Sequence, residues 1–438
     1  MAAPIALADE YPQWLGPRRD NVYREPGIVT SFPAAGLATV WRAPVGGGYA
    51  QVAVAPGKVI VLDRIAGPAA PRPANATGPA TQPGVERVLC LDDATGRQLW
   101  KVEYDCAYSI SYSAGPRTTP AIDGGRVYTL GAEGHVHCID LESGNVHWSK
   151  KLPGAPAVWG YAGSPLIEGE LLILLSSGRP LLTALDKVTG EVAWTALEVR
   201  DPGYVPPTPM TLAGRRQVVQ YHPTGVAGVD PTDGRVLWQL AHGPEQNGVT
   251  IVTPIQLDPD TLLLSSNWTG MAAIRVAPEG GARFLWHVKG KGRAIATLQA
   301  LHSQMVLHGG HVYGVHHTGA LVCVDPKDGR AVWSDPRPLL GADRERIQWG
   351  TGFLTPWQPD PAKPAEHFFL ATDAGDLILC DLSPQGYREI ARTHLLDPTN
   401  TDGGRPALWC HPTYAHQSVY WRNDKEVIRV NLAADAAR

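Results

Sequence analysis

The chain has 438 residues, and its 38 Lys and Arg against 42 Asp and Glu leave a formal net charge of −4. This near balance argues against a nucleic-acid binder or a basic membrane-surface protein. Hydrophobic residues make up 44%, but no run of about 18 apolar residues predicts a transmembrane helix. The 47 Gly and 39 Pro favour many turns and short strands over long helices.

The chain opens with AAPIALA at residues 2–8, which resembles the small-residue tail of a cleaved signal peptide. We expect an exported, periplasmic or otherwise extracytoplasmic protein. Residues 1–35 are interpreted as an N-terminal tail that packs on one domain formed by residues 36–438. Within that domain, residues 66–84 are rich in Pro and Ala and predict an exposed, mobile loop inserted in the first repeat unit.

A repeat occupies the rest of the chain. Five segments share an Asp, a Gly four residues later and a Trp eight residues later, and they lie at 90–100, 138–148, 184–194, 228–238 and 323–333. A degenerate copy runs from Ala273 to Trp286, and two strand-only copies lie at 377–382 and 427–432. The equivalent positions are 44 to 56 residues apart, which gives eight units. Each unit is long enough for four short antiparallel strands. This repeat length and strand number are typical of a propeller blade.

The two ends of the repeat complement each other. The last copy lacks the Trp-bearing fourth strand, and an isolated Val40-Trp41 strand lies near the N-terminus. A solenoid would need polar capping repeats at both ends. We therefore predict an all-β, eight-bladed β-propeller of four-stranded antiparallel blades, closed when the N-terminal strand pairs with the last blade.

The repeated residues have a structural explanation. The Asp carboxylate can accept a backbone N–H of the following turn, and the Gly supplies a positive φ. The Trp then lies on the outer strand, where its ring can pack on the next blade and its N–H can reach a carbonyl. These structural tryptophans are Trp41, Trp100, Trp148, Trp194, Trp238, Trp286 and Trp333.

The tandem Asp-Gly-Trp pattern resembles the tryptophan-docking repeat of the PQQ-binding-like, quinoprotein-type β-propellers, over nearly the whole chain. The segments at 11–27 and 112–140 look like bacterial exported members of that group. The resemblance implies relatives of two kinds: PQQ-dependent alcohol or glucose dehydrogenases, and a non-enzymatic propeller lipoprotein of the outer-membrane barrel-assembly machinery. Fold alone does not choose between them.

Several sequence features expected of a PQQ-dependent dehydrogenase are missing from this chain. Such enzymes resemble one another in a Ca²⁺ beside the quinone, and Ca²⁺ takes 6–8 oxygen ligands. Adjacent cysteines and a C-x-x-C-H haem motif are both missing. Acidic and amide residues that could still ligate calcium are Asp105, Glu245 with Asn247, Asp343 with Glu345, and Asn400 with Asp402. PQQ with Ca²⁺ is the cofactor of this alternative, and no spacing rule selects its ligands.

Non-repeated segments between blades are expected to line the mouth of the central channel. They are rich in aromatic, Thr, Gln and Arg residues, and Arg117 could present its guanidinium to a carboxylate or phosphate or instead satisfy carbonyls around the axis. The ligand-binding candidates are Tyr49, Gln51, Tyr112, Arg117, Thr118, Trp159, Tyr161, Gln299, Trp349, Trp409 and His411.

We predict no metal site. The histidine run at 302–317 includes His316 and His317, whose side chains are expected to point to opposite faces. Cys90, Cys138, Cys323 and Cys380 are interpreted as small buried hydrophobes. Cys106 and Cys410 leave two alternatives open, a disulfide or free thiols.

The sequence therefore favours a monomeric, exported propeller that binds a small polar or anionic ligand or a protein partner at the channel mouth. A PQQ- and calcium-dependent alcohol or sugar dehydrogenase is the enzymatic alternative, and a non-enzymatic scaffold is the third. No catalytic residue is identified.

Overall fold

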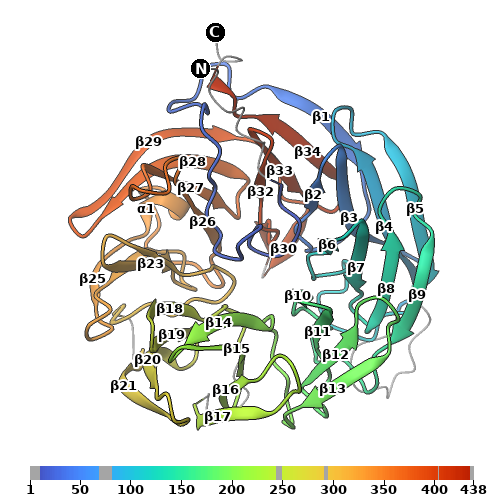
Figure 1. The fold of residues 1–438 in the computed structure, drawn as a ribbon. Helices are drawn as coiled ribbons and strands as arrows, with labels where there is room; N and C mark the ends of the chain where they lie inside the picture. Colours follow the sequence, from blue (N-terminus) through green and yellow to red (C-terminus); the bar gives the residue numbers. More distant parts are fainter. Residues whose placement is uncertain (1–9, 69–80, 243–248, 291–293, 403, 435–438) are drawn as a thin grey trace, which may run out of the picture.

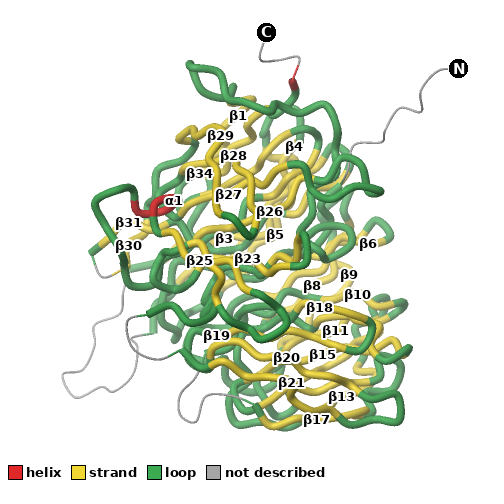
Figure 2. The backbone as a smooth tube through the Cα atoms, turned by 90° about the vertical axis from the view of Figure 1, so that its left-hand side faces the viewer, coloured by secondary structure: helices red, strands yellow, loops and turns green. Residues whose placement is uncertain are grey.

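The computed structural model describes residues 10–68, 81–242, 249–290, 294–402 and 404–434. Eight four-stranded antiparallel sheets follow one another around a ring, so the predicted eight-bladed propeller is confirmed (Figure 1). Helix is almost absent from the described residues: α1 (Arg337–Leu340) is a single turn (Figure 2). No helix in the described part of the chain is long and apolar enough to cross a membrane.

The first four blades run in chain order from the inner to the outer strand. Their strands are β2 (Ala53–Ala55), β3 (Lys58–Ala66), β4 (Gly84–Asp92) and β5 (Gln98–Asp105); β6 (Ala121–Asp123), β7 (Arg126–Leu130), β8 (His135–Asp140) and β9 (Val146–Lys151); β10 (Leu166–Glu168), β11 (Leu171–Leu175), β12 (Leu182–Asp186) and β13 (Val192–Ala196); β14 (Thr208–Leu212), β15 (Arg215–His222), β16 (Gly225–Val229) and β17 (Val236–Ala241).

The next three blades repeat this order. Their strands are β18 (Ile255–Asp258), β19 (Thr261–Ser266), β20 (Gly270–Val276) and β21 (Ala282–Val288); β22 (Val306–His308), β23 (His311–Val315), β24 (Leu321–Val324) and β25 (Ala331–Asp335); β26 (Gly352–Trp357), β27 (His367–Thr372), β28 (Asp376–Ser383) and β29 (Gly386–His394). A two-stranded ribbon, β30 (Asn400–Asp402) and β31 (Arg405–Ala407), leads into the eighth blade.

The eighth blade closes the ring. Its inner strands are β32 (Thr413–Ala415), β33 (Ser418–Arg422) and β34 (Glu426–Asn431), and its outer strand is β1 (Thr39–Pro44). β1 pairs antiparallel with β34, from Thr39 opposite Val430 to Pro44 opposite Glu426. Figure 1 shows the blue β1 beside the red β34. The closure predicted from the two incomplete ends is therefore confirmed.

The repeated turn is built as its residues predict. Asp92 Oδ1 accepts the Thr95 backbone N–H at 2.9 Å, and Gly96 has a φ of 70°. A Cβ on Gly96 would lie 2.7 Å from the Trp41 ring, so only glycine admits that ring here. A Cβ on four further glycines would lie 2.3–2.8 Å from the Trp ring of the preceding blade: Gly144 from Trp100, Gly190 from Trp148, Gly234 from Trp194 and Gly329 from Trp286.

The outer-strand indoles also reach the next blade through hydrogen bonds. The N–H donates to a backbone carbonyl in the pairs Trp41–Asp93, Trp100–Leu141, Trp148–Lys187, Trp194–Pro231, Trp286–Pro326 and Trp333–Ser383. Trp238 differs, because its N–H donates to Gln217 Oε1 of its own blade at 2.6 Å. The blade that follows Trp238 carries the degenerate repeat copy, which lacks the Asp-Gly turn.

The hydrophobic core lies between blades. One cluster joins Trp100 and Cys90 of the first blade to Val127 and Ile139 of the second. Equivalent clusters link each later pair of neighbours. Burying one such aliphatic side chain contributes about 1.5–3 kcal/mol. The blades are therefore held together mainly by apolar packing on their faces.

The insertion after β3 extends a hairpin. Ala66 and Gly84, expected to be part of a loop, are strand residues paired with each other, and residues 69–80 lie outside the described part. All six cysteines are buried and free, so the disulfide alternative is not realised. Cys410 instead donates to the Ala50 carbonyl at 3.2 Å.

Candidate functional site

A cavity of about 420 Å³ lies where the eight connections between blades converge. Each connection contributes at least one lining residue, which places the cavity on the axis of the ring. The lining residues are Trp14, Tyr49, Tyr112, Arg117, Trp159, Ala162, Ser164, Tyr204, Pro206, Val249, Ile251, Asn267, Trp268, Leu301, His302, Gln304, Trp349, Phe353, Trp409 and His411.

The segment before β1 adds Trp14 to this cavity. Figure 1 shows this dark-blue segment running to the middle of the ring. Arg19 donates to the carbonyls of Pro165 and Pro207 in two neighbouring connections, each at 3.2 Å. The Trp14 indole lies 3.5 Å from Thr253 Oγ1, and its ring lies 4.8 Å from that of His411. The segment thus covers part of the channel and supplies one aromatic wall.

Aromatic rings form a continuous belt around the cavity. Trp159 stacks on Tyr204 at 5.0 Å, and Tyr112 lies 6.3 Å from Trp159 and 5.4 Å from Trp409. The Trp409 ring then contacts His302 at 4.9 Å. These residues come from five different connections. Such a belt offers flat apolar faces to a planar or ring-shaped ligand.

Two of the aromatic residues have strained backbones. Tyr112 has a φ of 52° and Trp349 a φ of 56°, in the left-handed region that costs a non-glycine residue about 1–3 kcal/mol. Arg117 Nη2 donates to the Tyr112 carbonyl, and Arg405 Nη2 donates to the Trp349 carbonyl at 3.3 Å. Arg405 is itself paired with buried Asp373 at 2.9 Å. Arginines therefore hold both rings in orientations that the chain alone disfavours.

Arg117 combines the two roles that the sequence left open. Its guanidinium donates to the Gly115 carbonyl at 2.6 Å and the Ser111 carbonyl at 2.8 Å, besides that of Tyr112. It also lies 5.3 Å from the centre of the Tyr49 ring and lines the cavity. Backbone carbonyls carry no net charge, and no carboxylate of the described residues forms an ion pair with Arg117, although the charge of Glu86 acts on it from a longer distance.

The other titratable groups at the cavity are neutral at pH 7. Burial lowers the pKa of His302 to about 4 and that of His411 to about 3. Burial raises the pKa of both Tyr49 and Tyr204 to about 12, so each phenol keeps its proton. No Asp or Glu occurs among the described lining residues. Arg117 thus sets a positive potential in a site of otherwise uncharged groups.

Two buried polar atoms of the wall have no hydrogen-bond partner among the described residues. They are the Trp409 indole Nε1, a donor, and Asn267 Oδ1, an acceptor, and Asn267 is 8% exposed. An unsatisfied buried polar group costs about 1–3 kcal/mol. Both atoms belong to residues that line the cavity.

The predicted candidates separate into two groups. Seven line the cavity: Tyr49, Tyr112, Arg117, Trp159, Trp349, Trp409 and His411. Four are engaged in the scaffold instead: Gln51 donates to Pro412 O, Thr118 to Leu130 O, Tyr161 to Pro153 O and Gln299 to Asn267 O.

Sequence reasoning missed several lining residues. Trp14 lies in the N-terminal tail, whose aromatic content was the only signal available. Asn267 and Trp268 lie in the β19–β20 hairpin, whereas the prediction considered only connections between blades. Trp268 is 55% exposed, which places it at the rim.

The suggested calcium ligands do not gather at the cavity. None of the described candidates is a lining residue, and Asn400 Nδ2 donates to the Tyr49 hydroxyl at 2.7 Å from outside. Glu245 and Asn247 lie outside the described residues. The expectation for the histidine run was wrong in one respect: the rings of His316 and His317 stack 4.4 Å apart, because they lie in a turn rather than a strand.

A sequence model of the family described as outer membrane protein assembly factor BamB matches residues 84–335, more than half of the chain. The chain belongs to this family. A BamB from Moranella endobia is 22% identical over 263 residues, which cover 56% of this chain and 61% of that protein. The chain thus matches less than two thirds of that curated relative.

Two solved structures share the fold. The BamB of Moraxella catarrhalis superposes with a TM-score of 0.57 and 15% identity, over 90% of this chain and 99% of that one. The quinohemoprotein alcohol dehydrogenase of Comamonas testosteroni gives a TM-score of 0.60 and 12% identity, over 97% of this chain and 80% of that one. Identities this low show only that the chain is a PQQ-like β-propeller, as its repeats indicate.

Proposed function

We propose that the protein is a binding propeller whose axial cavity holds a small, flat, acceptor-rich ligand with negative charge, such as an aromatic carboxylate. The observation that carries this proposal is the combination of an aromatic belt, an arginine that forms no ion pair and a described lining without carboxylates. Flat faces suit stacking between rings. The positive potential favours an anion over a neutral molecule.

The hydrogen-bonding groups support the same class of ligand. The phenol of Tyr204 accepts from the Trp159 N–H at 3.3 Å and keeps its own O–H for donation. The Tyr49 hydroxyl accepts from Asn400 and likewise keeps its proton. The Trp409 N–H is a further donor, and it has no partner among the described residues. A ligand rich in carbonyl or carboxylate oxygens complements this set.

A PQQ- and calcium-dependent dehydrogenase is supported less well. The aromatic faces and Arg117 suit the flat tricarboxylate of PQQ. Calcium needs 6–8 oxygen ligands, however, and the described lining residues offer amide, hydroxyl and phenol oxygens but no carboxylate. The residues present therefore do not fit the calcium ion that such an enzyme uses.

Ligand binding can be tested with defined probes. Calorimetry and tryptophan fluorescence would compare quinoline-2-carboxylate with quinoline-2-carboxamide, and PQQ in EDTA with PQQ in Ca²⁺. We expect the carboxylate to bind at least tenfold more tightly than the amide, and PQQ to bind without calcium. Dye-linked turnover of alcohols or aldoses that depends on calcium would support the dehydrogenase instead.

Arg117 variants sharpen the test. Arg117→Met should remove the preference for the carboxylate, while Arg117→Lys, which keeps the charge but loses the fork, should retain part of it. Arg330→Met is a matched control, because Arg330 is 74% exposed on the outer turn of its blade. No binding of any flat ligand, or equal binding of the acid and the amide, contradicts the proposal.

A protein partner is the second candidate. Family membership supports it, and so does the exposure of Val158 (66%), Trp268 (55%) and Tyr112 (41%), the last two at the mouth of the cavity. We also propose that the chain is exported, supported by the family description and the signal-like residues 2–8, which lie outside the described part. Fractionation of the host cell for the native protein checks the location.

A further inference from the structure

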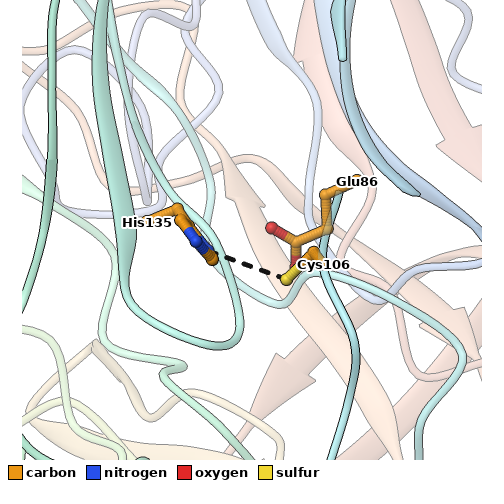
Figure 3. A group of neighbouring side chains, drawn as sticks. All are labelled: Glu86, Cys106 and His135. Carbon is orange, nitrogen blue, oxygen red and sulfur yellow. Dashed lines mark hydrogen bonds between the residues drawn. The ribbon is translucent and has the colours of Figure 1, made fainter. Parts of the chain in front are cut away.

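A second group of reactive side chains lies at the junction of the first and second blades, apart from the cavity (Figure 3). Glu86 is in β4, Cys106 follows β5 and His135 begins β8. One ligand atom from each lies within 4.8 Å of the other two, and Cys106 Sγ is 3.7 Å from His135 Nδ1. Among the described residues, this is the one group of three His, Cys, Asp or Glu with such spacing.

We propose that Glu86, Cys106 and His135 bind one Zn²⁺ ion through oxygen, sulfur and nitrogen. Zinc accepts this mixed donor set, with Zn–S near 2.3 Å and Zn–N or Zn–O near 2.0–2.2 Å. Tetrahedral bonds of those lengths separate the ligand atoms by roughly 3.3–3.7 Å. The sulfur and nitrogen already lie at that separation, and the carboxylate has to approach by about an ångström.

The electrostatics of Glu86 favour a cation at this point. Glu86 is 1% exposed, and no Lys or Arg in the described part of the chain forms an ion pair with it, although Arg117 acts on it from a longer distance. The carboxylate accepts hydrogen bonds from the hydroxyls of Tyr104 and Tyr108 and from the Ala132 backbone N–H. A carboxylate has about four lone-pair sites, so one remains for a metal. A bound cation would neutralise a buried charge that is otherwise expensive.

The other two ligands are suited to metal exchange with protons. Burial, followed by the charges of Glu86 and Glu133, raises the pKa of the Cys106 thiol, so it holds its proton without metal. Burial lowers the pKa of His135, so its imidazole is neutral and has a lone pair to donate. Zinc binding then forms a Zn–S bond, breaks the S–H bond and releases one proton to solvent.

Surrounding contacts orient the ligands. The Tyr104 ring lies 5.1 Å from the His135 ring, and its hydroxyl donates to Glu86 at 2.5 Å. One tyrosine thus positions two ligands, as outer-shell groups of zinc sites do. Three protein ligands leave a fourth position for water, and His135 is half-buried, which gives solvent a route to the ion.

A zinc ion here would join three strand ends of two blades. Cys106 also begins the connection that carries Tyr112 and Arg117 to the cavity. This site could not be predicted from the sequence, because its ligands are 20 and 29 residues apart and occur outside the repeat pattern. The inference is independent of the ligand proposed for the cavity.

The test is a calorimetric titration of the reduced full chain with ZnCl₂, with CaCl₂ as a control ion. We expect one equivalent of zinc, release of about one proton when buffers of different ionisation enthalpy are compared, and no calcium uptake. Cobalt in place of zinc should give a thiolate-to-metal charge-transfer band. Substoichiometric binding, or a cobalt spectrum without that band, overturns the proposal.

Variants separate this site from adventitious binding. Cys106→Ala and His135→Gln should each weaken zinc binding at least 100-fold, and Tyr104→Phe should weaken it about 10-fold. Cys410→Ala removes another buried free thiol and should bind zinc as the parent does. Circular dichroism verifies the fold of each variant. If folded His135→Gln, the half-buried position least tied to the core, binds zinc as tightly as the parent, the assignment is wrong.

Discussion

The outer turns of the blades repeat the same residues, whereas the inner connections around the cavity differ from blade to blade. On the outside, the Asp of all five Asp-Gly-Trp copies accepts a backbone N–H two or three residues later, and the Gly of each copy packs against the Trp of the preceding blade. On the inside, Trp159, Tyr112 and Trp409 belong to different connections and occupy no equivalent positions. The repeated turns hold the ring together, and the connections that do not repeat form the cavity. Substitutions outside should therefore change stability, and substitutions inside should change binding.

The largest expected effect is at the ring closure. Asp93, 8% exposed, accepts from His416 and Tyr420 and lies 3.2 Å from Arg429, all in the eighth blade. Asp93→Ala would leave Arg429 and His416 without their carboxylate partner, and we expect the free energy of unfolding in urea to fall by about 3–5 kcal/mol. The affinity for quinoline-2-carboxylate should not change.

The same carboxylate predicts a pH dependence. Burial would raise the pKa of Asp93, but hydrogen bonds from His416 and Tyr420 and the charge of Arg429 outweigh it and lower the pKa. Its contribution is present at neutral pH and is lost as the pH falls through this depressed value. Glu103→Ala, which removes the exposed Lys101–Glu103 pair, is the control and should lose far less stability, because solvent screens this pair. If Asp93→Ala and Glu103→Ala lowered the free energy of unfolding by similar amounts, the contacts of Asp93 at the ring closure would contribute no more than an exposed ion pair.

A smaller effect is expected at the turn glycines. They adopt a positive φ, and some of them also leave space for a Trp ring of the preceding blade. Gly144 and Gly125 have φ values of 75° and 77°, so alanine suffers the same backbone strain at both. A Cβ on Gly144 would lie 2.8 Å from the Trp100 ring, whereas nothing lies within 4 Å of one on Gly125. We expect Gly144→Ala to lose about 2 kcal/mol more than Gly125→Ala in urea unfolding. Equal losses would show that the ring moves aside without cost.

The outer repeat was predictable from sequence because each part of its geometry is local. Asp92 bonds to a residue three positions away, and Gly96 needs only its own φ. The closure followed from the missing strand of the last copy. The cavity was predictable only as a region, since Trp14 and Asn267 reach it from elements 253 residues apart. Arg117 illustrates what could not be predicted. Its residue type suggested an anion site, but the three carbonyls that accept its hydrogen bonds are known only from the structure.

A pH-dependent effect of similar size is expected inside the cavity. Burial holds the pKa of His411 at about 3, against about 6.5 in an unfolded chain. The unfolded state therefore binds a proton first, and stability falls as the pH drops below 6.5. Between pH 7.5 and pH 5 the loss from this group is about 2 kcal/mol. His411→Asn should reduce the difference between urea-unfolding free energies at those two pH values by that amount. A difference that stays the same in folded His411→Asn would assign the pH dependence to other groups.

The smallest effect on stability is predicted for Trp268 at the rim. Its side chain is 55% exposed, so Trp268→Ser should change the free energy of unfolding by less than about 0.5 kcal/mol. It nevertheless lines the cavity, and loss of one stacking face should weaken binding of quinoline-2-carboxylate about tenfold. Leu99→Ser replaces a side chain of comparable exposure, 40%, on the outer strand β5 and should affect neither quantity. If Trp268→Ser lowers stability without weakening binding, its ring supports the fold rather than the ligand, and the division between outer scaffold and inner site fails at the rim.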